Sequence, residues 1–333
     1  MKSRQIVLAS RPHGLPSFEN FRIEEKDLNK ISEGEVLLKS WFISVDPYMR
    51  GRMNDVKSYA PSFQVDQPIV GGVVAKVIES RSKSFIEGDT VFGMLPWATY
   101  CIEKVENLRK VDTQSAPPSY YLGILGMPGL TAYFGMMDIG KPKAGETVVV
   151  SGAAGAVGIV AGQIAKIQGA YVVGIAGSDD KCKLLKEQFR FDDAVNYKTS
   201  KTMRNVIAAI CPKGVDVYYD NVGGEITDAV ISNLNFHARI VLCGQISQYN
   251  NTEAQIGPSI LPKLLTRSVL LQGFIVSNYS DRFGDAFTHL TQWVNKGRLK
   301  YKETIIHGFD KLPDAFLGLF SGKNQGKMLI ETE

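Results

Sequence analysis

A glycine-rich turn between an apolar run and an amphipathic run is the first stretch of this chain with recognisable chemistry. Residues 148–166 read VVVSGAAGAVGIVAGQIAK, an order that predicts a strand, a tight turn and a helix. Backbone N–H groups at a helix N-terminus lack intrahelical partners, and with the helix dipole they favour a phosphate. Because the strand-like YVVGIAG follows, the stretch predicts a βαβ unit that binds a dinucleotide. The alternative is a tight helix–strand crossing that needs small residues for packing alone.

The residues after the second strand indicate which dinucleotide is bound. An NAD site places a carboxylate at this point to accept from the ribose hydroxyls. This chain has Gly177 and Ser178 there, with Lys181 following, and a hydroxyl and a cation suit an additional 2′-phosphate. The carboxylates of Asp179 and Asp180 weaken the case for NADP, although both could instead cap the N-terminus of the following helix. The pattern predicts NADP(H), with NAD as the alternative.

The glycine turn belongs to a segment in which strands and helices alternate. From Ala144 onward, apolar strand-like runs such as ETVVVSG and ARIVLCGQ are separated by stretches of helix length. Strands that are apolar throughout are typical of a parallel sheet covered on both faces, which binds ligands beyond the carboxyl ends of its strands. Up to about residue 120 the apolar runs are short, which predicts β-strands. The last thirty or so residues again contain short β-like runs.

Composition and charge narrow the possible function classes. The 333 residues predict two domains, and 44% hydrophobic with 22% charged residues is typical of a globular protein. The formal net charge of +4 comes without a long basic block, so neither nucleic acid nor an anionic membrane is an expected partner. No segment is long enough to span a bilayer, and four widely spaced cysteines indicate reduced thiols in the cytoplasm.

Eight motifs spread over nearly the whole chain carry a resemblance to a known family. They are SVDPYMRGRM, GMPGLTAYFG, GETVVVSGAAGAVG, AGSDDK, NYK, YYDNVGGE, CGQISQYN and GKNQGKMLI. Together they resemble the medium-chain dehydrogenase/reductase superfamily, in its zinc-independent branch of prostaglandin and leukotriene reductases and alkenal double-bond reductases. Bacterial NADP-dependent oxidoreductases of the curcumin reductase type are the most similar in texture.

The resemblance implies an α/β fold with two domains and a homodimer. A GroES-like catalytic β-domain would span residues 1–122 and be completed by 303–333. A doubly wound parallel-sheet (Rossmann) domain that binds NADP would span residues 123–302. This arrangement would explain why the final β-like runs are detached from the first ones.

The residues that would hold zinc in metal-dependent relatives are missing from this sequence. A catalytic zinc site needs Cys and His ligands, and a structural one needs four closely spaced cysteines. The chain has no cysteine in residues 44–48, and it has Gly71 and Gly72 where zinc-dependent relatives carry a Gly-His-Glu motif. We therefore expect no metal.

Without a Lewis acid, reduction of an activated C=C bond is easier than oxidation of an alcohol. Hydride from NADPH would attack the β-carbon of an enone or enal, and hydrogen-bond donors aimed at the carbonyl oxygen would be the main catalytic requirement. We expect an NADP-dependent oxidoreductase that reduces α,β-unsaturated ketones and aldehydes. A quinone reductase, a secondary-alcohol dehydrogenase and a non-catalytic NADPH-binding protein, crystallin-like or sensing, are the alternatives.

The resemblance also assigns roles to single residues. Tyr249 matches a family tyrosine near the substrate and the nicotinamide ribose, where a neutral phenol would donate to the oxyanion; a tyrosine on a mobile loop is the alternative. Tyr48 matches a tyrosine of the substrate pocket, with a core aromatic as the alternative. Cys243 also fits a small packed residue, and Phe274 and Val276 also fit buried strand residues. The implied cofactor site comprises Met127, Thr131, Ala154, Gly155, Ala156, Val157, Gly177, Ser178, Lys181, Tyr197, Asn221, Cys243, Gly244, Ser247, Phe274, Val276 and Asn324.

Overall fold

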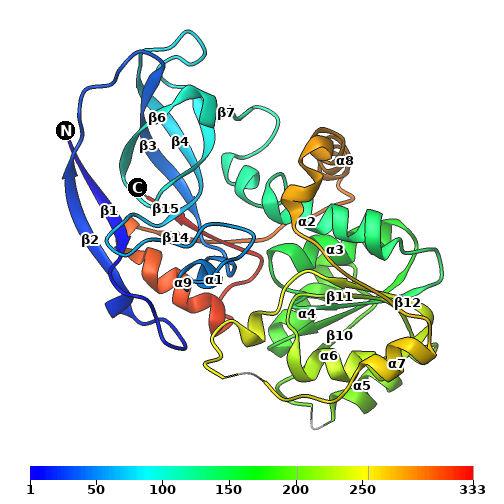
Figure 1. Cartoon of the computed structure of the whole chain (residues 1–333). Helices are drawn as coiled ribbons and strands as arrows, with labels where there is room; N and C mark the ends of the chain where they lie inside the picture. The colour runs from blue at the N-terminus through cyan, green and yellow to red at the C-terminus, as the bar shows by residue number, and fades with distance from the viewer. Residues whose placement is uncertain (201, 254, 333) are drawn as a thin grey trace. The chain divides into compact units, whose positions relative to one another are not determined.

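Two compact units make up the structure, a computed structural model that describes residues 1–200, 202–253 and 255–332 (Figure 1). The first unit comprises Met1–Gly123, Glu303–Asn324 and Met328–Glu333, and the second comprises Ile124–Lys302 and Gln325–Lys327. The first unit is therefore built from both ends of the chain, and the second is inserted between them. The assignment of catalysis to one unit and cofactor binding to the other stays a prediction.

The first unit contains a two-stranded sheet and a seven-stranded sheet. Its strands are β1 (Lys2–Leu8), β2 (Phe21–Asp27), β3 (Glu35–Ser44), β4 (Val70–Ser80), β5 (Thr90–Pro96), β6 (Tyr100–Lys104), β7 (Arg109–Lys110), β14 (Glu303–His307) and β15 (Lys327–Glu331). Strands β1 and β2 pair with each other, and the larger sheet has the order β14-β15-β3-β4-β5-β7, with β6 on β3. In the antiparallel pair β15–β3, Leu329 lies opposite Ser44, so both ends of the chain share one sheet.

Helix α9 (Leu312–Phe320) packs its apolar side into the core of the first unit. Leu312, Ala315, Phe316 and Leu319 recur at helical spacing and are buried. The Phe316 ring lies 6.3 Å from the Trp97 ring in an edge-on arrangement. The same core cluster includes residues of the short helix α1 (Met49–Arg52) and thereby anchors the segment that carries Tyr48.

A parallel six-stranded sheet forms the second unit. Its strands are β8 (Thr147–Ser151), β9 (Tyr171–Ala176), β10 (Asp193–Asn196), β11 (Val215–Asp220), β12 (Leu234–Leu242) and β13 (Leu270–Gly273). Their spatial order is β10-β9-β8-β11-β12-β13, the order of a doubly wound dinucleotide-binding sheet. The strand order reverses between β8 and β11, and ligands bind at such a point, outside the carboxyl ends of the strands. The predicted fold class is confirmed.

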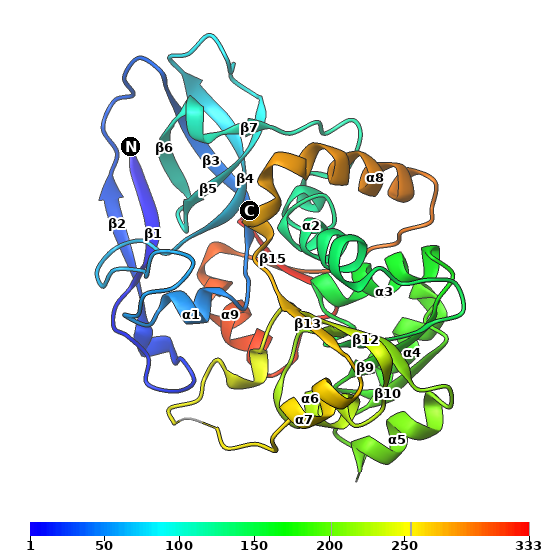
Figure 2. The same cartoon turned by 45° about the vertical axis from the view of Figure 1, so that its right-hand side comes forward.

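Helices cover both faces of the parallel sheet (Figure 2). Helices α3 (Ala156–Ile167) and α4 (Asp179–Phe189) contact each other and the strands β8 and β9. Helix α2 (Met127–Phe134) packs on α3, and α8 (Phe283–Asn295) packs on α2. Helices α5 (Met203–Ile210), α6 (Gly224–Ile231) and α7 (Leu261–Thr266) lie on the opposite side of the sheet. Short helical turns are η1 (Phe18–Asn20), η2 (Val105–Asn107), η3 (Pro118–Leu122), η4 (Gly135–Gly140), η5 (Ile246–Gln248), η6 (Val276–Arg282) and η7 (Phe309–Lys311).

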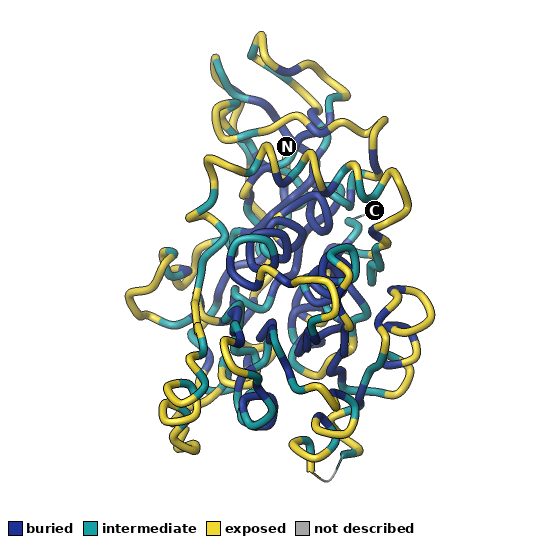
Figure 3. The backbone as a smooth tube through the Cα atoms, turned by 90° about the vertical axis from the view of Figure 1, so that its right-hand side faces the viewer, coloured by how far each residue is buried: buried dark blue, intermediate teal, exposed yellow. Residues whose placement is uncertain are grey.

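Burial differs between the centre and the edge of this sheet. Every residue of β8 is buried, as the apolar run Val148–Val150 at its centre predicts. All four residues of the edge strand β13 are exposed, although their sequence is also apolar in part. Phe274 and Val276 are half-buried and follow β13, so their interpretation as buried strand residues is wrong. In Figure 3 the dark-blue buried segments lie mainly inside and the yellow exposed segments lie mainly outside.

None of the helices within the described ranges is both long and apolar enough to cross a membrane.

Candidate active site

The glycine turn connects β8 to α3 with close backbone contacts. Gly152 has a φ of +57°, a conformation that favours glycine. The N–H of Gly155 donates to the carbonyl of Gly152 at 3.0 Å, and α3 begins at Ala156 with Gly155 as its N-cap. A Cβ on Gly158 would lie 2.4 Å from the Gly152 carbonyl oxygen. Only glycine at 158 therefore lets the first helical turn approach the strand, as the dinucleotide-binding fingerprint requires.

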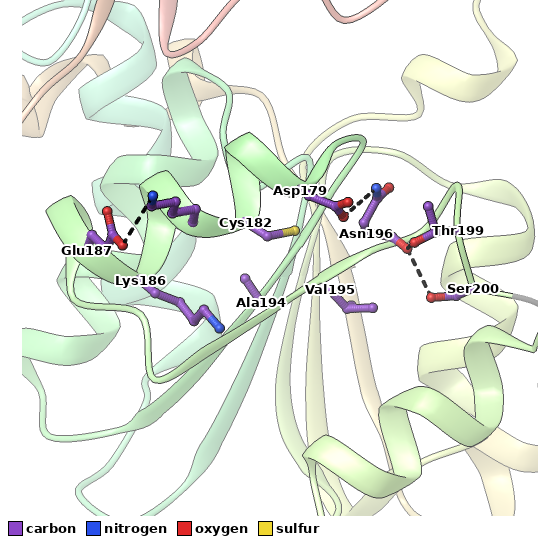
Figure 4. Close-up of a pocket in the computed structure, with 10 residues that line it drawn as sticks. Asp179, Cys182, Lys186, Glu187, Ala194, Val195, Asn196, Thr199 and Ser200 are labelled. Atoms are coloured by element: carbon purple, nitrogen blue, oxygen red, sulfur yellow. Dashed lines mark hydrogen bonds and ion pairs between the residues drawn. The ribbon is translucent and has the colours of Figure 1, made fainter.

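Ser178 lies two residues after the end of β9 and is the N-cap of α4. Its Oγ accepts from the backbone N–H of Lys181 at 3.3 Å, which satisfies a donor in the first helical turn. The N-cap residue is Ser178 and not Asp179 or Asp180, which occupy the first turn. There their carboxylates still favour the positive end of the helix dipole. Asp179 also accepts from the Asn196 side chain at 2.8 Å, as Figure 4 shows at the rim of a hollow between α4 and β10.

Two lysines lie close together beside this turn. Burial and the nearby charge of Lys198 lower the pKa of the half-buried Lys181. A Cβ on Gly177 would lie 3.2 Å from the Tyr197 ring and 3.5 Å from the Lys198 side chain. An anion at this point would relieve the repulsion between the two lysines, so the residues present fit a 2′-phosphate.

The sequence interpretation missed Lys198. The parallel pairing of β10 with β9 sets Asn196 opposite Ala176, and the residues that follow both strands therefore meet at one edge. Lys198 could have been found in the sequence as a basic residue shortly after the strand-like run DDAVNY, which is next along the chain after β9.

The ends of β11 and β12 bring further candidate residues to the same edge of the sheet. The Asn221 amide donates to the carbonyl of Ser151 at 2.7 Å, which ties the end of β11 to the end of β8. Backbone N–H groups of Cys243 and Gly244 donate to the Asp220 carbonyl at 2.9 and 3.0 Å. The Ser247 hydroxyl donates to the Val222 carbonyl at 2.6 Å.

Cys243 is held as a neutral thiol. Burial raises its pKa to about 12, and a protonated thiol is a poor nucleophile. This supports the interpretation of Cys243 as a small packed residue that lines a site without reacting there.

Tyr249 follows η5 and is half-buried. Its Oη accepts from the backbone N–H of Gln245 at 3.3 Å, and it would lie 3.3 Å from a Cβ on Gly244. Burial is the main cause of a raised pKa for Tyr249, so the phenol keeps its proton and can donate. The loop that follows has no helix or strand from 250 to 253 or from 255 to 260, and Ala254 lies outside the described residues.

Tyr48 belongs to the first unit and directly precedes α1. The residue is half-buried. Burial, followed by the charge of Asp46, raises the pKa of Tyr48, while Arg52 acts in the opposite direction. The Tyr48 phenol therefore also stays protonated.

The remaining predicted residues lie in three places. Met127 and Thr131 form the first turn of α2, where the Thr131 hydroxyl donates to the Met127 carbonyl at 2.7 Å. Phe274 and Val276 follow β13. Asn324 belongs to the first unit, two residues before Gly326, whose N–H donates to the Ala154 carbonyl at 2.8 Å.

Most of the candidate residues of the second unit follow the carboxyl ends of its strands. They are Ala154–Val157, Gly177–Lys181, Tyr197, Asn221, Cys243–Ser247 and Tyr249. Such an edge binds an extended anionic ligand along the sheet, with a hydrogen-bond donor toward one end. Across the described parts of the chain, no cluster of three or more His, Cys, Asp or Glu is placed to hold a metal ion. Zinc independence stays a prediction.

Comparisons with known proteins place this arrangement among characterised folds. Residues 4–111 match a family model described as the N-terminal domain of oxidoreductase, and residues 156–293 match one described as zinc-binding dehydrogenase. NADPH-dependent curcumin reductase of Escherichia coli is 45% identical over 334 residues, covering 99% of this chain and 96% of its own. The NADP(+)-dependent 2-alkenal reductase of Nicotiana tabacum is 41% identical over 335 residues, covering 99% and 97%. The crystal structure of CurA with NADPH from Vibrio vulnificus superposes with a TM-score of 0.94 at 44% identity, covering 99% of both chains.

Proposed function

The chain belongs to the NADP-dependent oxidoreductases of the medium-chain dehydrogenase/reductase superfamily, and we propose that it reduces the C=C bond of α,β-unsaturated ketones and aldehydes. The names of two relatives, a curcumin reductase and a 2-alkenal reductase, support this substrate class. The observation that carries the proposal is the half-buried, protonated phenol of Tyr249, which accepts from the Gln245 N–H at the carboxyl edge of the parallel sheet.

The residues at this edge fit the family's cofactor, NADP(H). The turn at Ala154–Val157 would hold the pyrophosphate at the N-terminus of α3. Gly177, Ser178, Lys181 and Tyr197, together with Lys198, would hold the 2′-phosphate. The chemistry that NADPH supplies when bound is hydride donation to the β-carbon of the substrate. The other predicted residues would line the cofactor groove: Met127, Thr131, Asn221, Cys243, Gly244, Ser247, Phe274, Val276 and Asn324.

Tyr249 would stabilise the charge that develops on the substrate. Addition of hydride to the β-carbon moves an electron pair onto the carbonyl oxygen, and the Tyr249 hydroxyl donates a hydrogen bond to that oxygen. The resulting enolate takes a proton at its α-carbon from water or a nearby acid. Tyr48, whose phenol also stays protonated, is proposed to line the substrate pocket.

A substrate panel tests the proposed function. We expect NADPH consumption with enones and enals, at rates that clearly exceed those with NADH, and undiminished activity in the presence of a metal chelator. Turnover of quinones alone would instead favour a quinone reductase, and turnover of secondary alcohols with NADP⁺ would favour a dehydrogenase. Tight NADPH binding with no turnover of any of these compounds would favour a binding or sensing protein.

We also propose that the protein is a cytoplasmic homodimer. The edge strand β13 would form its interface. In β13 the side chains of Leu270 and Leu271 are 50% and 39% exposed, and in α7 those of Leu261 and Leu265 are 71% and 81% exposed. The α7 leucines line a hollow of about 730 Å³. An exposed apolar edge strand promotes association unless it is covered, and a second copy paired about a twofold axis would cover it.

The oligomeric state tests this interface. Light scattering coupled to size-exclusion chromatography should give twice the chain mass of 36.6 kDa. Leu270→Lys should shift the protein toward monomer, because a lysine on an edge strand opposes pairing. Ile86→Lys, at a residue 67% exposed in the first unit, should leave the dimer intact. A monomeric wild type, or a dimer that both variants preserve, would contradict the assignment.

A further inference from the structure

Asp220 ends β11 and gathers donors from several elements. Asp220 is fully buried, and among the described residues the donors to its carboxylate are all neutral groups. The Ser151 hydroxyl (3.0 Å), the Tyr218 hydroxyl (2.9 Å) and the N–H groups of Val222 and Gly223 (both 3.0 Å) donate to Oδ1. The Thr227 hydroxyl (2.7 Å) and the Gln245 amide (2.9 Å) donate to Oδ2. These six hydrogen bonds join the end of β8, the start of α6 and the segment after β12.

One of these hydrogen bonds leads to the candidate donor. Gln245 binds Asp220 through its side chain and donates its backbone N–H to the Oη of Tyr249 at 3.3 Å. On the basis of the proposed function, we propose that Asp220 is a positioning residue that sets the Tyr249 hydroxyl through Gln245. Asp220 itself touches neither cofactor nor substrate in this role.

The direction of the hydrogen bond explains why this position matters. A phenol oxygen that accepts one hydrogen bond has its own hydrogen left to donate elsewhere. The Gln245 N–H therefore directs the Tyr249 hydrogen away from the backbone. A donor acts on an oxyanion only if it is held at hydrogen-bonding distance from the place where charge develops, and small displacements of such groups cost large factors in rate.

The crowding around Gln245 leaves its side chain little choice of position. A Cβ on Gly223 would lie 2.1 Å from the Gln245 side-chain oxygen, and Gly223 has a φ of +78°. The Gln245 amide also donates to the Gly244 carbonyl at 2.9 Å. The segment that ends in Tyr249 is thereby tied to Asp220 by a packed side chain.

Gln245→Met is a better test of this role than Asp220→Asn. An asparagine at 220 would set the N–H₂ donor of its amide against hydrogen-bond donors and so disturb folding. Methionine keeps the length of glutamine and removes the side-chain hydrogen bonds to Asp220 and to the Gly244 carbonyl, while the backbone N–H that binds Tyr249 remains. We expect kcat for an enone to fall about 5- to 30-fold, with the Kd for NADPH changed by less than about threefold. Thr227→Val is the matched control, because it removes the other donor to Oδ2 and leaves the link to Tyr249 intact. Its kcat should stay within about twofold of wild type.

A double-mutant cycle with Tyr249→Phe separates positioning from a general structural effect. If Gln245 acts through Tyr249, Gln245→Met should not lower kcat further when Tyr249 is phenylalanine. The positioning role is wrong if Gln245→Met keeps the wild-type kcat, if Thr227→Val lowers kcat equally, or if the two losses multiply in the double variant. These results leave the proposed function standing. A wild type that reduces no enone with NADPH overturns the proposed function and the positioning role together.

Discussion

Tyr249→Phe is expected to lower kcat for enone reduction about 100- to 1000-fold, the usual loss when one oxyanion donor is removed. The substitution removes one oxygen from a half-buried side chain and keeps the ring. That oxygen accepts from the Gln245 N–H, which is left without this acceptor. The Kd for NADPH should change by less than about threefold, because the phenol acts on the substrate oxygen.

The pH dependence provides a second check on Tyr249. Burial raises its pKa above the usual tyrosine value of about 10, so the neutral donor persists through that pH. Loss of kcat from ionisation of Tyr249 should therefore have its midpoint above pH 10. A loss of kcat that begins below pH 9 and disappears in Tyr249→Phe would contradict a raised pKa of Tyr249.

Tyr171→Phe is the matched control for Tyr249→Phe. Tyr171 begins β9 and is 38% exposed, at the end of the sheet opposite the glycine turn. Its kcat and its Kd for NADPH should equal those of the wild type. If Tyr249→Phe also keeps its kcat across several enones, Tyr249 is not the oxyanion donor.

The parallel sheet could be predicted because its central strands carry mostly apolar runs, such as Val148–Val150 in β8. Such runs have few other places in a globular fold than between two layers of helices. The edge strand β13 carries a similar apolar sequence and is exposed. A run of apolar residues is the same whether a helix of the same chain or a second chain covers it, so this difference could not be predicted from the sequence.

The candidate cofactor site could be predicted from the sequence where it depends on one continuous segment. Gly152–Gly158 and Gly177–Lys181 each follow a strand directly, and local sequence carries the turn and the helix cap. Lys198 and Gln245 reach the site through strand pairing, which the sequence does not reveal. Asp220 could have been singled out from the sequence alone. The motif YYDNVGG shows an acidic residue at the end of an apolar strand, where the strand reaches the sheet edge that binds ligands.

Lys181→Ala and Lys198→Ala are each expected to weaken NADPH binding about 10- to 100-fold, the loss of one charge-assisted hydrogen bond or close ion pair. The two lysines lie close enough that the charge of Lys198 lowers the pKa of Lys181. A 2′-phosphate between them would replace this repulsion by two attractions. NADH has a hydroxyl at that position, so its Kd should change by less than about threefold in either variant.

Fluorescence titration with NADPH and NADH measures both constants on the same protein. Lys183→Ala is the control, because Lys183 is an exposed lysine of α4 that pairs with Glu187 at 4.0 Å. Its Kd for NADPH should match the wild type. The preference for NADPH should also weaken with added salt, since contacts of exposed or half-buried charges are screened. If both lysine variants weaken NADPH and NADH equally, they support folding of the turn, and recognition of the 2′-phosphate must lie elsewhere.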